Sequence, residues 1–323
     1  MKKLISVVLA AAMLFCLCAC GKSSDRLDSV NVYVLTGPTG IGAADLWNRS
    51  DKGETSVKYN FTAASAPDEI VAKISNGEAD IAAVATNLAA KLYKKSDKGI
   101  KILAVNTLGV LSVLDNSGAE ITSLKDLTGR KIVTTGQGAN PQYIIEYLLK
   151  ENGIDPEKDV SIEYKAEGSE LQTVWAADPA AVIIAPAPVS TAITMKYEGS
   201  GKVLDLTDEW NKCADGSKLM MGCIIAREDF IKEHKDAADE FLSEYEKSIN
   251  AVNGDPSAAG ILCEQYGLAA KAALAAKSVP DCHLCFITGD DMKSGLGGYL
   301  QILYDADPSS VGEMPDDGFW YNK

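Results

Sequence analysis

From Ser29 onward, short apolar runs alternate with amphipathic stretches, and turn residues separate them. The apolar runs are rich in β-branched residues, which favour strands, whereas the amphipathic stretches have apolar residues at helical spacing. This strand–turn–helix order indicates a mostly parallel sheet with helices on its faces. Strands are predicted at 30–35, 57–62, 81–85, 100–106, 130–134, 160–164, 181–185 and 221–226, and helices at 41–48, 70–76, 88–93, 142–152, 171–176 and 189–197.

The strand–turn–helix order occurs in two halves, the second of which begins after Thr107. Two similar lobes are therefore expected, one formed by residues 29–108 plus 223–323 and the other by residues 109–222. The chain would cross between them near 106–110 and 221–226, with Gly109 and Gly222 as flexible hinge points. After Asp229 the pattern is almost entirely helical, with helices expected at 237–252, 258–266 and 289–304.

The first twenty residues have the pattern of an export signal. Lys2 and Lys3 precede an apolar run too short to be a stable membrane span, and small residues follow it. The Leu-x-Ala-Cys ending at Cys20 resembles the lipobox of bacterial lipoproteins, which implies a signal peptide at 1–19 and a diacylated Cys20. Residues 20–28 would then be the lipidated N-terminus and a linker, because two acyl chains suffice for stable anchoring. The alternative is an ordinary signal peptide with chance cysteines.

Composition narrows the classes of partner. The formal net charge is −14, and removal of Lys2 and Lys3 with the signal would make the chain more acidic still. This excess of acid argues against a nucleic-acid partner, since phosphate binding needs clustered Lys and Arg. An anionic small ligand stays open, because helix N-termini bind anions without net charge.

Five cysteines follow Cys20, and an odd number leaves at least one thiol free or paired between chains. Cysteines outside the cytoplasm often pair, and Cys223 with Cys282 is the expected disulfide. Cys282-His283-Leu284-Cys285 also has the spacing of a metal or thiol-redox motif. A zinc site usually needs a second such cluster, which the sequence lacks, so no metal is expected.

Four segments resemble a known superfamily. They are 36–40 (Thr-Gly-Pro-Thr-Gly), 73–82 (Lys-Ile-Ser-Asn-Gly-Glu-Ala-Asp-Ile-Ala), 123–132 (Ser-Leu-Lys-Asp-Leu-Thr-Gly-Arg-Lys-Ile) and 183–188 (Ile-Ile-Ala-Pro-Ala-Pro). Together they resemble the solute-binding proteins of ABC importers, within the superfamily that binds sulfonate, taurine, nitrate and the thiamine pyrimidine. The resemblance covers most of the chain after the signal.

This resemblance implies an α/β, two-lobed periplasmic-binding-protein-like fold of type 2, with two crossover strands and a mostly parallel sheet flanked by helices in each lobe. It implies a monomer that captures a small organic ligand between the lobes and delivers it to an ABC permease and its ATPase. The protein would then be lipid-anchored on the extracytoplasmic face of the cell membrane. It would need no cofactor.

A ligand in such a fold lies beyond the carboxyl ends of the strands, where loops lead into helix N-termini. Five loops answer this description, at 37–40, 65–67, 86–87, 136–141 and 186–188. Their glycines let backbone approach a ligand, and their hydroxyl and amide side chains offer neutral hydrogen-bonding groups. The candidate ligand-binding residues are Gly37, Pro38, Thr39, Ser65, Ala66, Thr86, Asn87, Gly136, Gln137, Gly138, Asn140 and Pro186.

Structural roles compete with several of these assignments. Gly37–Gly40 is also a common turn, Ser65 or Ala66 also caps a helix, and Trp47 and Trp175 are expected in the core. Two other functions stay open. One is an extracellular sensor with the same fold, and the other is a pyrimidine-synthesis-like enzyme. The enzyme branch uses a cysteine-rich iron motif that this sequence lacks, so no enzyme is expected. The identity and charge of the ligand stay open.

Overall fold

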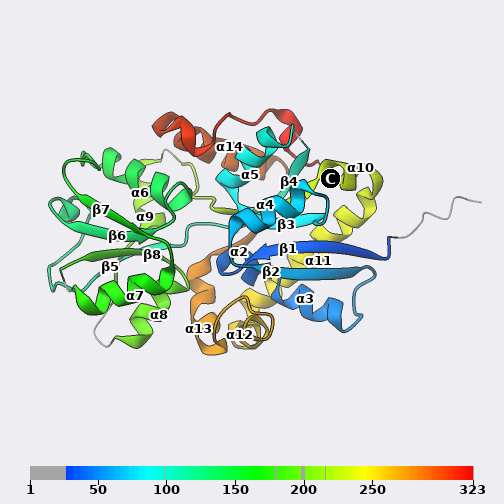
Figure 1. Ribbon diagram of the computed structural model, residues 1–323, viewed down its shortest axis with the longest axis horizontal. Coiled ribbons are helices and arrows are strands. Elements are labelled where there is room, and N and C mark those ends of the chain that lie inside the picture. The colour runs from blue at the N-terminus through cyan, green and yellow to red at the C-terminus, as the bar shows by residue number, and fades with distance from the viewer. Residues whose placement is uncertain (1–26, 98, 179, 198–200, 215, 323) are drawn as a thin grey trace, which may run out of the picture.

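The computed structural model describes residues 27–97, 99–178, 180–197, 201–214 and 216–322. The predicted signal peptide and Cys20 lie outside these residues. The chain forms two β-sheets, each flanked by helices, and we call the parts built on them the first and second lobes (Figure 1). The first lobe has the order β11-β4-β10-β3-β1-β2, with β1 Ser29–Leu35, β2 Lys58–Ala64, β3 Ile81–Ala85, β4 Ile100–Thr107, β10 Gly222–Arg227 and β11 Leu284–Ile287.

The second lobe repeats the order of the first sheet, but its described residues include no strand that corresponds to β11. Its order is β7-β6-β8-β5-β9, with β5 Leu111–Asp115, β6 Lys131–Thr135, β7 Ser161–Lys165, β8 Val182–Pro186 and β9 Gly201–Asp205. In each sheet, the strand that enters from the other lobe is antiparallel to both of its neighbours: β10 lies between β3 and β4, and β5 lies between β8 and β9. Both sheets are therefore mixed, with four strands running in one direction.

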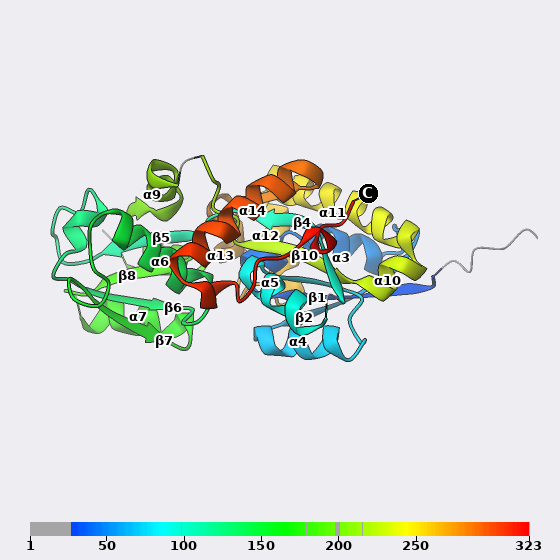
Figure 2. The same ribbon diagram turned by 90° about the horizontal axis from the view of Figure 1, so that it is seen from above.

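Helices cover both sheets and link them. The first lobe carries α2 Pro38–Ile41, α3 Ala44–Asp51, α4 Pro67–Ser75, α5 Thr86–Lys95, α10 Glu228–Glu233, α11 Lys235–Gly254, α12 Pro256–Gln265 and α13 Ala272–Ser278. The second carries α6 Asn140–Glu151, α7 Gly168–Ala177, α8 Val189–Lys196 and α9 Leu206–Cys213. The last helix, α14 Gly289–Ala306, packs on β4 and on α6, and so touches both lobes (Figure 2). Four 3-10 turns complete the order: η1 Leu124–Leu127, η2 Val279–Cys282, η3 Pro308–Ser310 and η4 Asp317–Phe319. None of the helices described is long and apolar enough to cross a membrane.

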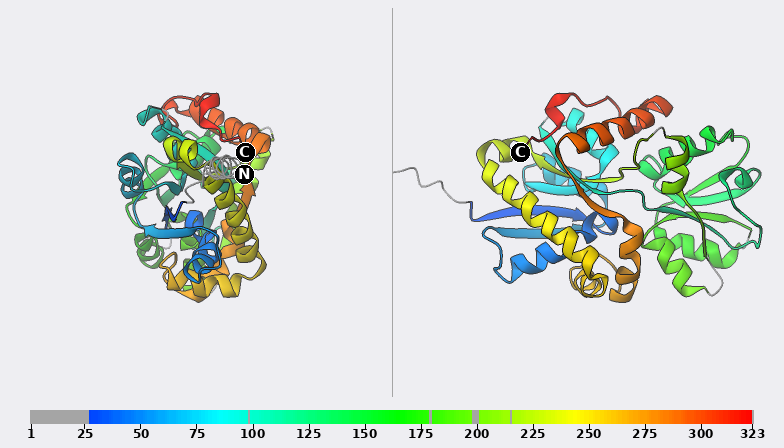
Figure 3. Two further views of the ribbon diagram at one scale, coloured as in Figure 1. Left: turned by 90° about the vertical axis from the view of Figure 1, so that its right-hand side faces the viewer. Right: turned by 180° about the vertical axis from the view of Figure 1, so that it is seen from behind.

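One hydrophobic core runs through both lobes. It includes Val84 and Cys223 on one face of the first sheet, Val113 and Ile132 on one face of the second, and Leu296 of α14. The opposite faces have separate cores, one under α3 and α11 and one under α7 and α8. Figure 3 shows α14 crossing between the lobes, with α11 along the back of the first lobe.

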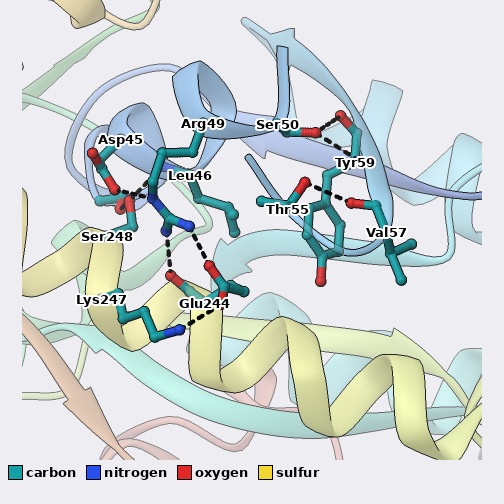
Figure 4. A network of polar contacts seen from close by, with 11 residues as sticks. Asp45, Leu46, Arg49, Ser50, Thr55, Val57, Tyr59, Glu244, Lys247 and Ser248 are labelled. Atoms are coloured by element: carbon teal, nitrogen blue, oxygen red, sulfur yellow. Dashed lines mark hydrogen bonds and ion pairs between the residues drawn. The ribbon is translucent and has the colours of Figure 1, made fainter. Parts of the chain in front are cut away.

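A polar network holds α3 against α11 at the outer face of the first lobe (Figure 4). Arg49 donates from Nε to Asp45 at 2.7 Å, contacts the Glu244 carboxylate and donates from Nη2 to the Glu244 carbonyl at 3.0 Å. The buried Ser248 hydroxyl donates to Gly42 O at 2.7 Å and accepts from Leu46 N at 3.0 Å. The bond from Leu46 N satisfies one of the free backbone donors at the start of α3.

The predicted disulfide between Cys223 and Cys282 is wrong. All five cysteines in the described part of the chain are free thiols. Cys223 lies in the core shared by the two lobes, whereas Cys282 lies in the core on the other side of the first sheet. Successive residues of a strand point to opposite faces, and Ile224 rather than Cys223 points toward the core of Cys282. Spacing along the sequence carries no information about the face of the sheet.

Native thiol labelling checks this correction. Burial raises the pKa of Cys282 and of Cys263 to about 12 and also raises that of Cys223. Since only the thiolate reacts, we expect iodoacetamide at pH 8 to leave these three cysteines unmodified in the folded protein and to alkylate all three after unfolding without reductant. Peptide mass spectrometry measures both states. Half-buried Cys213 is the internal control and should be labelled first, and a Cys223–Cys282 cross-linked peptide would contradict the structure.

Candidate functional site

The loop after β1 meets the loop after β8 across the lobe boundary. Gly37 precedes α2 with φ of 89°, which favours glycine, and its N–H donates to Leu268 O at 3.0 Å. A Cβ placed on Gly37 would lie 3.9 Å from Pro188 Cδ, so the two lobes approach closely here. Buried Asn106 holds Thr39 of α2 in place. Its Nδ2 donates to Thr39 O and to Tyr245 Oη, each at 2.9 Å.

A second junction joins the first turns of α5 and α6. Thr86 opens α5 after β3, and its hydroxyl donates to Met220 O at 2.7 Å. Asn140 opens α6 after β6, and its Nδ2 donates to Met221 O at 2.9 Å and to Thr86 Oγ1 at 3.3 Å. Two predicted site residues from different lobes are therefore in direct contact, beside the chain segment that returns to the first lobe.

Helix α14 and turn η3 close this junction. Asn87 donates from Nδ2 to Ser310 O at 3.2 Å, and Tyr143 Oη lies 3.5 Å from Ser309 Oγ. Tyr299 of α14 is buried, and its hydroxyl lies near the Thr86 side chain. We call Thr86, Asn87, Asn140, Tyr299 and Ser310 the interlobe polar cluster, and each of them is at most 2% exposed.

Four groups in the interlobe polar cluster lack a hydrogen-bond partner of normal geometry among the described residues. They are Asn87 Oδ1, Asn140 Oδ1, Tyr299 Oη and Ser310 Oγ. Burial raises the pKa of Tyr299 well above its usual range, while the neighbouring Thr86 acts in the opposite direction. The phenol therefore keeps its proton and can donate. Buried polar groups are normally paired, so unpaired ones at the boundary of two lobes make this junction the candidate functional site.

The structure places the other predicted residues less centrally. Ser65 and Ala66 are exposed, and Ala66 caps α4 without a side-chain hydrogen bond. Gln137 and Gly138 are exposed, and Gly138 N donates to Gln142 Oε1 at 2.8 Å. Pro186 ends β8 and pairs with Leu111, and Gly136 lies against the Pro141 ring. Trp175 is buried as expected, whereas half-buried Trp47 stacks on Phe61 and Tyr266.

Sequence reasoning missed Tyr299, Ser310 and Asn106. The first two come from the C-terminal helix and the turn after it, more than 200 residues from Thr86, and nothing in their local pattern distinguishes them from core residues. Asn106 gave a signal that could have been used, because it is an amide that directly follows the apolar run 102–105 near the end of a strand. A polar side chain at such a position must find a buried partner.

Other hollows and clusters lie away from the junction. A hollow of about 1050 Å³ lies between the end of α6 and β7, lined by Lys150, Asp155 and Tyr164 among others, and it contains no predicted loop residue. It is open to solvent, whereas the interlobe polar cluster is buried. Within the part of the chain that the structure describes, no group of three or more His, Cys, Asp and Glu residues is placed to hold a metal ion.

Comparison with solved structures shows the fold. The chain is similar to an ABC transporter protein from Parabacteroides distasonis, with 21% identity, coverage of 92% of this chain and 99% of that one, and a TM-score of 0.76. It is also similar to the periplasmic aliphatic sulphonate binding protein SsuA from Escherichia coli, with 12% identity, coverage of 91% and 92%, and a TM-score of 0.73. A ligand-binding component of an ABC-type import system from Staphylococcus aureus, solved with zinc bound, gives 16% identity, coverage of 89% and 99%, and a TM-score of 0.66.

Sequence comparison shows the family. A search of curated proteins gave no match. The family model described as NMT1/THI5 like matches residues 55–259, which is more than half of the chain and includes strands, helices and crossovers of both lobes. The chain therefore belongs to the NMT1/THI5-like family.

Proposed function

We propose that the protein is the extracytoplasmic solute-binding component of an ABC importer. The observation that carries this proposal is the interlobe polar cluster, in which the first turns of α5 and α6, together with α14 and η3, bring buried polar groups without partners to the lobe boundary. The family membership and the solved transport proteins of the same fold support it. A small organic solute would be held there, with contacts from predicted residues such as Thr39, Thr86, Asn87 and Asn140.

Capture would work by lobe closure. The lobes are joined through the short segment after β4 and through a second segment before β10, of which residues 216–221 are described. A solute that contacts both lobes binds better when they are closed. No bond is broken in this mechanism. The closed form of the monomer would then present both lobes to an ABC permease, whose ATPase drives import.

A solute panel tests the proposal. Tryptophan fluorescence and thermal unfolding of the chain from residue 21 would be measured against several hundred small organic solutes. A true solute at 100 times its Kd should stabilise the folded state by about 2.7 kcal/mol. Small-angle scattering should then show a more compact particle with that solute present. If no solute in a broad panel stabilises the protein, the binding function is contradicted.

We also propose that Cys20 carries the lipid anchor, an assignment that rests on the sequence alone. Cys20→Ala should shift the protein from the membrane fraction to the soluble or secreted fraction and remove a mass increment of two acyl chains and a glycerol, because only a lipidated residue holds it at the membrane. Cell fractionation and intact-protein mass spectrometry measure both effects. The matched control is Cys18→Ala, which alters a neighbouring cysteine and should leave anchoring unchanged. Release by Cys18→Ala but not by Cys20→Ala would reverse the assignment.

A further inference from the structure

We propose that the solute is an uncharged molecule that offers N–H or O–H donors to the interlobe polar cluster, and that this site discriminates against oxyanions. The inference rests on the proposed function and deepens it. It sets this chain apart from the sulphonate-binding protein that shares its fold.

Two amide side chains of the interlobe polar cluster have a fixed orientation. Asn140 donates from Nδ2 to Met221 O, and Asn87 donates from Nδ2 to Ser310 O. A carbonyl accepts only from the nitrogen side of an amide, so both side-chain oxygens are fixed in direction. Those oxygens are the buried atoms that lack partners within the described structure. Each can only accept, so a molecule that binds them must donate to them.

The N-termini of α5 and α6 offer few free backbone N–H groups. A helix N-terminus binds an anion through free backbone N–H groups. At α5 the first of these is already used, since Thr86 N donates to Met221 O at 3.0 Å. At α6, Pro141 has no N–H, and Gln142 N donates to Ala139 O at 3.1 Å. Both ends therefore keep few donors for an oxyanion.

The side chains of the interlobe polar cluster are uncharged. None of the five residues of the interlobe polar cluster is Lys or Arg. The nearby cation is Lys91, whose Nζ lies over the Tyr143 ring at 5.4 Å from the centroid, on the flank of the cluster. The Tyr299 and Ser310 hydroxyls can donate or accept, so they suit an uncharged solute with mixed polar groups. An oxyanion would face two fixed amide oxygens, and none of the five residues of the interlobe polar cluster carries a positive charge to offset them.

Matched pairs of probes test this inference directly on the wild-type protein. Nicotinamide and nicotinate share one skeleton, as do benzenesulfonamide and benzenesulfonate, and in each pair only the first member is uncharged with N–H donors. Isothermal titration should show the uncharged member binding at least 10-fold more tightly. Tighter binding of the anionic member of either pair would overturn the inference while leaving the solute-binding function intact. If neither pair binds, the solute of the broad panel with the highest affinity is decisive. An uncharged hydrogen-bond donor supports the inference, and an oxyanion overturns it.

Variants of the two amide residues test whether the uncharged probe binds at the interlobe polar cluster. Asn140→Leu and Asn87→Leu keep the branched shape of the side chain but remove its acceptor oxygen together with its donor bond to Met221 O or Ser310 O. Each should weaken binding of the uncharged probe at least 10-fold. The matched control is Asn152→Leu, because Asn152 caps the far end of the same helix α6 and donates to Leu148 O. The control should bind as the wild type does. Unchanged affinity in a folded Asn140→Leu or Asn87→Leu variant would contradict the assigned contacts. A variant that fails to fold leaves the decision to the probe pairs, which need no variant.

Discussion

Replacement of Trp210 by alanine should lower the free energy of unfolding by about 3–5 kcal/mol. The side chain is fully buried on α9, and its ring lies against Tyr147 of α6 at 5.0 Å and against Tyr299 of α14 at 5.4 Å between centroids. Its indole Nε1 donates to Ser217 O at 3.1 Å. Alanine would leave a large cavity at the place where the second lobe packs on α14, and it would also free Tyr299 of the interlobe polar cluster.

Urea unfolding followed by circular dichroism measures this loss, because the substitution removes a fluorophore. Trp210→Phe is the conservative variant, and it should keep most of the apolar contact while losing the bond to Ser217. Trp47→Ala is the matched control, since Trp47 is also stacked between two aromatic rings but is half-buried at the surface of one lobe. If Trp210→Ala costs no more than Trp47→Ala, the shared core does not join the lobes as described.

Local patterns predicted much of this fold because they match the physics of strand and helix formation. The runs at 30–35, 81–85 and 181–185 are apolar and bounded by turns, and they form β1, β3 and β8 within one or two residues. The strands that escaped prediction are β5, β9 and β11. β5 follows the crossover with no helix between it and β4, and the other two are short and are partnered only on one side. These segments form strands because they pair with a neighbouring strand in the fold, which the local sequence pattern does not show.

The site was harder to predict because it is assembled from distant segments. Thr86 and Asn140 could be placed at helix starts, but only tertiary packing shows that they touch. Exposed Gln137 has the same chemistry as Asn140 and lies three residues earlier, and the sequence offers no basis for ranking one above the other. The Cys223–Cys282 error has the same origin, since the face of the sheet on which a residue lies depends on the whole fold.

The last prediction concerns Gly222, which the sequence suggested as a flexible hinge point. In the structure it is tightly packed. A Cβ at this position would lie 2.6 Å from Thr39 Cγ2, 2.8 Å from Asn106 Oδ1 and 2.8 Å from Thr107 Cβ. Such distances force neighbours to move, so we expect Gly222→Ala to destabilise the protein by about 1–3 kcal/mol. Because Asn106 holds Thr39 and α2 in place, the variant should also weaken solute binding.

Gly201→Ala is the matched control, because Gly201 also begins a strand but has open space where the Cβ would lie. It should change stability by no more than about 0.5 kcal/mol, as surface substitutions usually do. Urea unfolding and the affinity for a solute identified in the panel measure both variants. A hinge role predicts the opposite result for Gly222→Ala, namely unchanged stability with altered rates of lobe opening and closing. The two results separate a glycine required for close packing from one required for motion, and the contacts to Thr39 and Asn106 favour packing.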